Sequence, residues 1–275
     1  PVATGFHTNF HAYSSHYGAG WLSPAITAYL RRFHNRADCT IVPTEELAES
    51  LSQLHFERLR VAGRGIDTQV FSPARRSAEL RRSWGADEST LVVLCVGRFA
   101  REKNLPLAIE TFRAMRAACG NTQLVLVGDG PLAAELERVN IGHVLARRRV
   151  DADLATHYAS ADVFLFPSMT ETFGNVTLEA MASGLAVVAF DYAAARQYLA
   201  HDQSALLAPF NEPAWFIEPA ARLARRPGRI ARLGMEARRI AELLSWDAAV
   251  RDFENALVEV ARGRACSFEP APGTA

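Results

Sequence analysis

The chain has 275 residues, of which 49% are hydrophobic and 22% are charged. Lysine and arginine together number 30, the same as aspartate and glutamate, so no excess of positive charge indicates a nucleic-acid-binding protein. No apolar run approaches the roughly 18 residues that a membrane-spanning helix needs. The chain is long enough to bury one large hydrophobic core or two modest ones.

The cysteines indicate neither a metal site nor a disulfide framework. Cys39, Cys95, Cys119 and Cys266 are scattered along the chain without the spacing that metal sites show. Cys95 lies in an apolar strand pattern, which is typical of a small buried thiol. We therefore expect reduced thiols and a cytoplasmic protein.

The first part of the chain mixes short apolar segments with helical patterns. Strands are predicted at residues 2–6, 39–42 and 59–62. A helix is predicted at residues 23–36, because Pro24 suits the first helical position and apolar residues then recur at helical spacing. Thr44 is the predicted N-cap of the next helix. Residues 72–90 are interpreted as the connection to a second domain.

From Leu91 onward, apolar strands alternate regularly with helices. Strands are predicted at residues 91–96, 123–127, 143–146, 162–166, 186–190 and 205–208. Helices are predicted at residues 104–118, 131–139, 152–160, 175–183 and 193–200, and three more at 212–226, 228–243 and 246–262. This alternation indicates α/β architecture with a parallel, doubly wound sheet, whose ligands bind at the carboxyl ends of the strands. The tail at residues 263–275 is predicted to be disordered.

Two carboxylates follow the strand at residues 162–166. Glu171 lies on the loop and Glu179 lies inside the next helix, which Gly184 ends. The helix start leaves backbone N–H groups near Asn175, Val176 and Thr177 without helical partners, and the helix dipole favours an anion there. Gly174 lets the backbone approach a ligand closely. The loop and helix therefore suit a ligand with a central anionic group and hydroxyls at both ends, such as a nucleotide-sugar.

Two cations follow the first strand of the second domain. Arg98 comes just after that strand, and Lys103 lies just before the next helix. Cations at the carboxyl end of a strand can neutralise a diphosphate, both when it binds and when it leaves. The alternative is that both are solvated charges on a surface loop.

These motifs resemble those of the retaining group 1 glycosyltransferases, in which two Rossmann-like domains face a cleft in the GT-B fold. The segment Glu171–Glu179 resembles their E-x7-E motif, residues 96–104 their phosphate-binding segment, and residues 125–131 their next strand and turn. Residues 6–10 and 65–71 resemble GDP-mannose-dependent lipid mannosyltransferases and sulfolipid synthases within the family. The resemblance covers about residue 1 to about residue 260.

The resemblance implies a domain organisation. It makes residues 1–73 the C-terminal part of an N-terminal acceptor domain, and it implies that most of that domain is missing from this chain. It makes residues 74–244 a complete donor-binding Rossmann-like domain. Residues 245–262 become a helix that crosses back to the first domain.

The resemblance also implies an activity and residue roles. The expected reaction moves a hexose, first of all mannose from GDP-mannose and alternatively the sugar of a UDP-sugar, to an acceptor hydroxyl with retention of configuration. The expected acceptor is a glycolipid at the inner membrane face. The implied catalytic residues are His7, Arg98, Lys103 and Glu171, and the implied donor-binding residues are Phe173, Gly174, Asn175, Val176, Thr177, Glu179 and Gly128. No metal cofactor is required if Arg98 and Lys103 neutralise the diphosphate.

Within these roles, the resemblance assigns Glu171 to the hydroxyls of the donor sugar and Glu179 to the ribose. The alternatives are a loop charge for Glu171 and a surface charge on a helix for Glu179. Phe173 is interpreted as a structural side chain whose backbone contacts the donor.

His7 follows a strand and resembles the family's active-site histidine near the reacting sugar. Together with His11 and His16 it could instead bind a metal, but spacings of four and five residues on a loop are weak evidence. Asn9 and Tyr13 are candidates for the same cleft. The basic helix at residues 23–36 could touch a membrane surface, with a core-facing helix as the alternative.

Two other stretches leave alternatives open. Arg147 stands where the family pattern usually has a glycine on the nucleobase side, so residues 147–149 could be a solvated basic turn. Gly128, Gly130 and Ala133 form a loose dinucleotide fingerprint, with Asp151 and Asp153 about twenty residues on. The functions that compete with glycosyl transfer are therefore a nucleotide-sugar-binding fragment without turnover and an NAD-type oxidoreductase domain.

Overall fold

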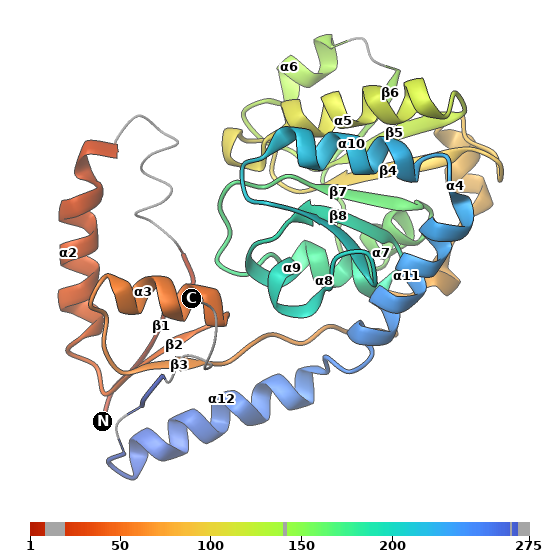
Figure 1. The fold of residues 1–275 in the computed structure, drawn as a ribbon. Helices are drawn as coiled ribbons and strands as arrows, with labels where there is room; N and C mark the ends of the chain where they lie inside the picture. The colour runs from red at the N-terminus through yellow and green to blue at the C-terminus, as the bar shows by residue number, and fades with distance from the viewer. Residues whose placement is uncertain (9–19, 140–141, 265, 269–275) are drawn as a thin grey trace. The chain divides into compact units, whose positions relative to one another are not determined.

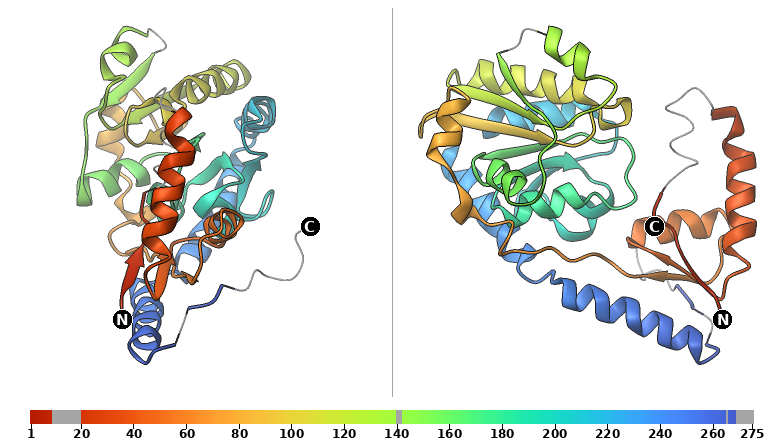
Figure 2. Two further views of the ribbon diagram at one scale, coloured as in Figure 1. Left: turned by 90° about the vertical axis from the view of Figure 1, so that its left-hand side faces the viewer. Right: turned by 180° about the vertical axis from the view of Figure 1, so that it is seen from behind.

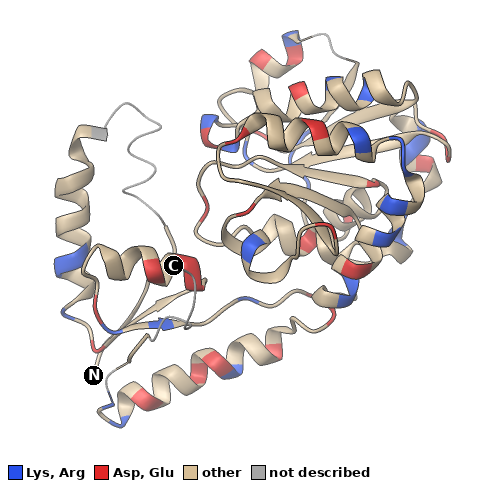
Figure 3. Cartoon of the chain, viewed as in Figure 1, with Lys and Arg blue, Asp and Glu red and all other residues tan. Residues whose placement is uncertain are grey.

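A computed structural model describes residues 1–8, 20–139, 142–264 and 266–268 (Figure 1). Its contacts divide the chain into two compact units. Unit 1 comprises residues 1–65, 170–173 and 244–275, and unit 2 comprises residues 66–169 and 174–243. Across the helices of unit 2, acidic and basic residues are interspersed (Figure 3). None of the described helices is long and apolar enough to cross a membrane.

Unit 1 is built on a parallel sheet of three strands in the order β1-β2-β3. The strands are β1 (Ala3–Gly5), β2 (Cys39–Val42) and β3 (Leu59–Val61), and the helices are η1 (Gly20–Leu22), α2 (Ser23–His34), α3 (Glu45–Gln53) and α12 (Trp246–Ala261). The Thr44 side chain accepts a hydrogen bond from the Leu47 amide, so it is the N-cap of α3 as predicted. Phe6, Leu51 and Phe56 belong to the small core beneath this sheet.

Unit 2 contains a parallel sheet of six strands in the order β6-β5-β4-β7-β8-β9. Its strands are β4 (Leu91–Val96), β5 (Thr122–Val127), β6 (His143–Ala146), β7 (Val163–Phe166), β8 (Ala186–Phe190) and β9 (Ala205–Ala208). The strand order reverses between β4 and β7, which is the arrangement of a doubly wound sheet. The predicted fold class is therefore confirmed, and the reversal marks where a ligand can enter.

Helices cover both faces of this sheet (Figures 1 and 2). They are α5 (Leu105–Ala118), α6 (Ala133–Arg138), α7 (Asp151–Ala159), α8 (Asn175–Ala182), α9 (Ala193–Tyr198), α10 (Pro213–Leu223) and α11 (Pro227–Ala241). Phe112 of α5 and Phe216 of α10 are fully buried in one core with alternate residues of the strands. The strands are buried on both sides, which explains why they read as continuous apolar runs in the sequence.

The segment at residues 72–90 is more than a connection. It contains the turn η2 (Pro73–Arg75) and the helix α4 (Ala78–Ser83), which the Ser77 side chain caps at the Leu80 amide. Arg81 of α4 is only 2% exposed and forms an ion pair with Asp162, at 3.3 Å from Nη1 to Oδ2. The helix is short and its buried side chain is an arginine, so apolar periodicity does not reveal it.

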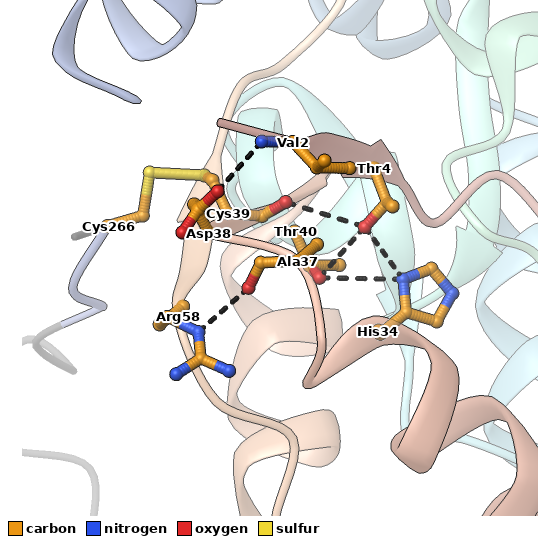
Figure 4. The surroundings of a disulfide bond; sticks show 9 residues. All are labelled: Val2, Thr4, His34, Ala37, Asp38, Cys39, Thr40, Arg58 and Cys266. Atoms are coloured by element: carbon orange, nitrogen blue, oxygen red, sulfur yellow. Dashed lines mark hydrogen bonds between the residues drawn. A yellow bond between two sulfur atoms is a disulfide. The ribbon is translucent and has the colours of Figure 1, made fainter. Parts of the chain in front are cut away.

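The expectation of four reduced thiols is wrong for two of them. Cys39 and Cys266 form a disulfide (Figure 4), while Cys95 and Cys119 are free. Beside the bond, the Thr4 and Thr40 hydroxyls lie 3.0 and 3.4 Å from Nδ1 of the buried His34. The expectation of a cytoplasmic protein rested on reduced thiols, and the disulfide leaves that expectation without support. Cys95 is buried as predicted, and burial raises its pKa to about 12.

The structure describes part of the segment that was predicted to be a disordered tail. Cys266 is 5% exposed, and Phe268 packs against the core of unit 1. These contacts hold the segment after α12 against β2. The rest of the predicted tail, residues 265 and 269–275, lies outside the described residues.

Candidate functional site

A cavity of about 580 Å³ opens at the carboxyl end of the six-stranded sheet. It is lined by Gly97 and Arg98 after β4, by Gly128, Asp129 and Gly130 after β5, and by Arg148 and Arg149 after β6. The volume is within the usual range for small-molecule sites. Because the strand order reverses beside β4, this is also the edge at which doubly wound sheets bind their ligands.

Two glycines shape the floor of this cavity. Gly97 has a φ of 152°, and a Cβ built on it would meet nothing within 4 Å, so it would point into open space. Gly128 serves a different purpose, since a Cβ there would lie 1.9 Å from the Gly97 carbonyl oxygen. The two glycines thus bring neighbouring strand ends together and keep the space above Gly97 empty. That space can admit a group of a ligand close to the backbone.

Both predicted cations lie at the switch point between β4 and β7. Arg98 is exposed, and its guanidinium makes no ion pair with any residue that the structure describes. Lys103 is half-buried at the end of the turn η3 (Arg101–Lys103), and its Nζ lies 5.8 Å from the ring centroid of Phe166 in β7. A small hollow between the ends of β4 and β7 is lined by both cations. The structure therefore brings Arg98 and Lys103 together at one edge of the sheet.

The loop after β7 is tied to the loop after β4 through Glu102, a residue that the sequence did not single out. The Glu102 carbonyl accepts hydrogen bonds from the Met169 amide at 2.8 Å and from the Ser168 hydroxyl at 3.4 Å. Glu102 is 1% exposed. A glutamate between an arginine and a lysine looks like part of a solvated charge run, so the sequence carries little signal for its burial.

The start of α8 differs in one detail from the expectation. Gly174 caps the helix in the left-handed region with a φ of 92°, and the Thr177 amide donates to the Gly174 carbonyl at 2.9 Å. Thr177 is therefore removed from the amides that could meet an anion. Asn175 is exposed and Val176 is half-buried, so the first turn of α8 is accessible.

Phe173, just before this helix, is 2% exposed. The guanidinium carbon of Arg64 lies 5.7 Å from the centroid of its ring. This burial fits the expectation that the Phe173 side chain is structural.

Glu179 is not the surface charge of the alternative interpretation. It is half-buried, and its Oε2 accepts a hydrogen bond of 2.8 Å from the hydroxyl of Tyr158 in α7. Burial raises the pKa of the Glu179 carboxyl, and the Tyr158 hydrogen bond opposes part of that rise. Burial, followed by the charge of Glu179, raises the pKa of Tyr158 well above its usual value. Sequence reasoning missed Tyr158, which lies on another helix.

Glu171 and His7 both belong to unit 1. Glu171 is half-buried in the stretch at residues 170–173. The hydroxyl of the neighbouring Thr172 donates to the His7 carbonyl at 2.9 Å, and the His7 side chain is exposed after β1. His11, His16, Asn9 and Tyr13 lie outside the described residues.

The basic segment after β6 divides into two parts. Arg147 forms an ion pair with Glu137 at 2.9 Å and lies 4.0 Å from Asp129, both on the surface. Arg148 and Arg149, in contrast, line the cavity. Arg147 thus fits the solvated turn of the alternative interpretation, and its two neighbours remain candidates for contact with a ligand.

Two residues of the loose dinucleotide fingerprint, Asp153 and Gly130, contact other residues of unit 2. Asp153 lies 3.4 Å from both Arg149 and His157, at the start of α7. The glycine turn is shaped by the close approach of Gly130 to the Phe99 backbone.

Comparisons with known proteins match both parts of the chain to glycosyltransferases. Residues 90–226 match the family described as glycosyl transferases group 1, and residues 1–70 match glycosyltransferase family 4. The GDP-mannose-dependent α-mannosyltransferase of Mycolicibacterium smegmatis is 38% identical over 75% of this chain and 54% of its own length. The GDP-mannose-dependent α-(1-6)-phosphatidylinositol dimannoside mannosyltransferase of Mycobacterium tuberculosis is 34% identical over 67% of this chain and 48% of its own length. The chain thus spans about half the length of these relatives.

The fold has a counterpart among solved structures. Sucrose-phosphate synthase from Thermosynechococcus elongatus superposes with a TM-score of 0.77 over 95% of this chain and 68% of its own, at 23% identity. That likeness concerns the fold. The family matches over both parts of the chain oppose the NAD-type oxidoreductase interpretation. By its sequence and its two α/β units, the chain belongs to the group 1 glycosyltransferases and has their GT-B fold.

Proposed function

We propose that this protein takes part in a retaining glycosyl transfer that moves mannose from GDP-mannose to an acceptor hydroxyl. The observation that carries the proposal is the cavity above Gly97, which leaves room beside the backbone and is flanked by Arg98. Lys103 lies at the adjacent switch point. A diphosphate is the ligand group that best matches two cations beside an open glycine.

The cations also account for the chemistry of the leaving group. Negative charge develops on the nucleotide diphosphate as its bond to the sugar breaks, and fixed positive charges stabilise it. Arg98 and Lys103 supply that charge, and the Val176 amide at the start of α8 adds a hydrogen-bond donor. In this scheme no metal ion is needed to neutralise the diphosphate.

Retention follows if the acceptor attacks the face from which the nucleotide leaves. The bond between the anomeric carbon and the phosphate oxygen breaks, and a bond from that carbon to the acceptor oxygen forms on the same face. The proton of the acceptor hydroxyl passes to the leaving phosphate oxygen. We assign Glu171 to the hydroxyls of the sugar, Glu179 to the ribose and His7 to the reacting end of the sugar.

The donor proposal rests on the GDP-mannose-dependent relatives, which are 38% and 34% identical to this chain. A UDP-sugar is the alternative donor. Arg148 and Arg149, which line the cavity beyond Gly128, are the proposed residues on the nucleobase side.

The proposed acceptor is a glycolipid at a membrane surface. One relative is named for a phosphatidylinositol dimannoside acceptor. In unit 1, the helix α2 exposes Tyr29 to 70% and Phe33 to 53%, and it carries Arg31 and Arg32. Exposed aromatic and basic side chains on one helix suit peripheral contact with an anionic membrane.

A second candidate function is donor binding without turnover by these 275 residues. It is favoured by the coverage, since the chain spans about half the length of its relatives. Calorimetry with GDP, UDP and GDP-mannose, paired with an assay for mannosylated lipid, separates the two. Donor binding with product supports transfer, donor binding without product supports the second candidate, and no binding contradicts both.

The phosphate assignment is tested with Arg98→Ala and Lys103→Ala. Each charge-assisted hydrogen bond contributes roughly 1.5–3 kcal/mol, so each substitution should weaken GDP binding about ten- to a hundredfold. Arg147→Ala is the matched control, because Arg147 is held by Glu137 and does not line the cavity. Unchanged GDP affinity in either test variant removes that residue from the phosphate site.

The orientation of the donor is tested with Glu171→Ala and Glu179→Ala. Loss of Glu171 should spare GDP and weaken GDP-mannose, because Glu171 is assigned to the sugar. Loss of Glu179 should weaken both ligands to a similar extent, because both contain the ribose. If Glu171→Ala weakened GDP as strongly as GDP-mannose, the proposed orientation would be wrong.

A further inference from the structure

The side chain of Tyr158 in α7 is fully buried, and its hydroxyl donates a hydrogen bond to Glu179 in α8. We propose that Tyr158 is a positioning residue for the nucleotide: it fixes the Glu179 carboxylate so that this carboxylate can accept a hydrogen bond from the ribose. The inference rests on the proposed function, which assigns Glu179 to the ribose. Tyr158 acts only through Glu179, because a buried side chain does not reach the ligand.

The Glu179 carboxylate is held at one oxygen only. Its Oε2 accepts the Tyr158 hydrogen bond at 2.8 Å, whereas Oε1 makes no hydrogen bond with any residue that the structure describes. Glu179 is half-buried, and Oε1 is not one of the described buried polar atoms that lack a partner, so solvent reaches it. An ionised carboxylate is an acceptor at both oxygens. With one oxygen anchored and the other accessible, this carboxylate is arranged to accept from a ligand.

The pair lies close to the proposed donor site. Leu154 of α7 lines the cavity at the carboxyl end of the sheet. Tyr158 follows it by four residues, so the two lie on the same side of α7, one turn apart. Glu179 lies about one turn into α8, which begins at Asn175 after the loop that follows β7. The hydrogen bond therefore joins two helices whose starts lie at the ligand-binding edge of unit 2.

The direction of the Tyr158 hydroxyl is fixed by packing. The Tyr158 ring lies 5.8 Å, between centroids, from the rings of Phe71 and of Phe164 in β7. The Phe71 carbonyl accepts a hydrogen bond of 2.8 Å from Nη1 of Arg238 in α11, and the same Nη1 donates to the Ala182 carbonyl at the end of α8. Both ends of the helix pair are thus held to α11. A side chain that contacts a ligand is kept in position by such supporting contacts.

Two physical effects connect this support to ligand affinity. A glutamate held in its binding conformation loses less side-chain entropy when the ligand arrives. The Tyr158 hydrogen bond also favours the ionised form of Glu179 and opposes the rise in its pKa that burial causes. Without the Tyr158 hydroxyl, the carboxyl is both less ordered and more easily protonated, and so it is a poorer acceptor for a ribose hydroxyl.

The test compares three ligands by calorimetry with the full chain: GDP, 2′,3′-dideoxy-GDP, which lacks the ribose hydroxyls, and inorganic pyrophosphate. The wild type should bind GDP about ten- to a hundredfold more tightly than dideoxy-GDP, the range for a hydrogen bond to a charged group. In Tyr158→Phe, which keeps the ring, this preference should fall about fivefold or more. The affinities for dideoxy-GDP and pyrophosphate should not change. Equal losses for all three ligands would show a merely structural role.

A second variant pair tests whether Tyr158 acts through Glu179. In a Glu179→Ala background, Tyr158→Phe should not weaken GDP binding further, and an additional loss would contradict the proposal. Tyr198→Phe is the matched control, because it removes a tyrosine hydroxyl that accepts from Nε2 of Gln197 at 3.0 Å, on another helix of unit 2. It should keep the wild-type preference for GDP. A fall as large as in Tyr158→Phe would mean that the preference follows general loosening of the fold.

The same measurements separate this inference from the proposed function. If the wild type bound neither GDP nor pyrophosphate, the proposed function would be wrong and the inference would fall with it. If the wild type bound GDP and dideoxy-GDP equally, Glu179 would be removed from the ribose while the phosphate site stood. If Tyr158→Phe kept the full wild-type preference for GDP, only the positioning role of Tyr158 would be overturned.

Discussion

The hydroxyl of Tyr158 in α7 donates a hydrogen bond to Oε2 of Glu179 in α8, at 2.8 Å. Tyr158 is fully buried, so the bond brings a carboxylate toward the interior of unit 2. Burial raises the pKa of Glu179 more than the hydrogen bond lowers it. The residue proposed to hold the ribose is therefore one whose ionised form weakens the fold.

The first prediction concerns the pH dependence of stability. A carboxyl whose pKa is raised by folding contributes most below its unfolded-state value of 4.5, and this contribution is lost as the pH rises through the folded-state pKa. Glu179→Gln removes the titration but can still accept from Tyr158. The variant should therefore gain stability relative to the wild type as the pH rises from about 4.5 toward neutral. Urea unfolding across that range measures the difference.

Glu110→Gln is the control for this experiment, because Glu110 is an exposed glutamate on α5. Its difference from the wild type should stay nearly constant with pH. The same Glu179→Gln variant should bind GDP more weakly, so stability and ligand binding should change in opposite directions. A stability difference for Glu179→Gln that does not vary with pH would show that the carboxyl is not perturbed by burial.

The second prediction concerns the open space above Gly97. Gly97→Ala should weaken GDP binding at least tenfold, because the methyl group enters the proposed diphosphate site. The backbone conformation there is nearly restricted to glycine, so a stability loss of about 1–3 kcal/mol is also expected. Gly85→Ala controls for strain, since Gly85 has a φ of 73° and open space around it but lies outside the cavity. Equal GDP affinity in the two variants would remove Gly97 from the site.

The third prediction concerns Arg81. Its guanidinium donates to the carbonyls of Ser160, Asp87 and Thr90 at 2.6–2.8 Å and pairs with Asp162. Arg81→Met removes one donor from each of these acceptors, although Asp162 keeps Arg76 and the Val92 amide. Breaking a buried pair costs about 3–5 kcal/mol. Arg82→Met, at the exposed neighbouring position, should stay within about 0.5 kcal/mol of the wild type. Urea unfolding compares them, and equal stability would mean that Arg81 does not hold α4 to the sheet.

The strands and most helices could be predicted from the sequence because burial on both faces leaves a plain signal. The residues predicted as strands 91–96 and 143–146 are those of β4 and β6. Helix ends were less accurate, as for residues 131–139, of which α6 covers Ala133–Arg138. Leu132 precedes that helix without a side-chain cap, so no residue type marks its start.

The parts of the site that the sequence missed depend on contacts between distant elements. Tyr158 and Glu179 are 21 residues apart on two helices, and either residue alone looks ordinary. Glu102 looks solvated but holds the loop after β7 through its carbonyl. Arg98, Lys103 and Gly128 could be predicted to lie at the same edge of the sheet because each follows a strand. In a doubly wound sheet the carboxyl ends of the strands form the ligand-binding edge.

The disulfide could not be foreseen for a similar reason. Cys39 and Cys266 are 227 residues apart. They meet because α12 and the segment after it belong to unit 1. The resemblance implied that residues 245–262 return to the first domain, but no local spacing in the sequence pairs these two cysteines.

The fourth prediction concerns this disulfide. The denatured, unreduced protein should show two reactive thiols, those of Cys95 and Cys119, and four after reduction. The double variant Cys39→Ser/Cys266→Ser should destabilise unit 1 by about 2–4 kcal/mol, the usual range for a lost native disulfide. Hydrogen exchange separates the units, with faster exchange expected in β2 and unchanged exchange in β4.

Cys119→Ser is the control, because Cys119 is a free thiol in unit 2. It should leave exchange in β2 unchanged and lower the thiol count of the unreduced protein from two to one. If the unreduced protein already titrates four thiols, the bond does not form in the isolated protein. The tail after α12 would then be held only by the packing of Phe268 and a buried Cys266 side chain.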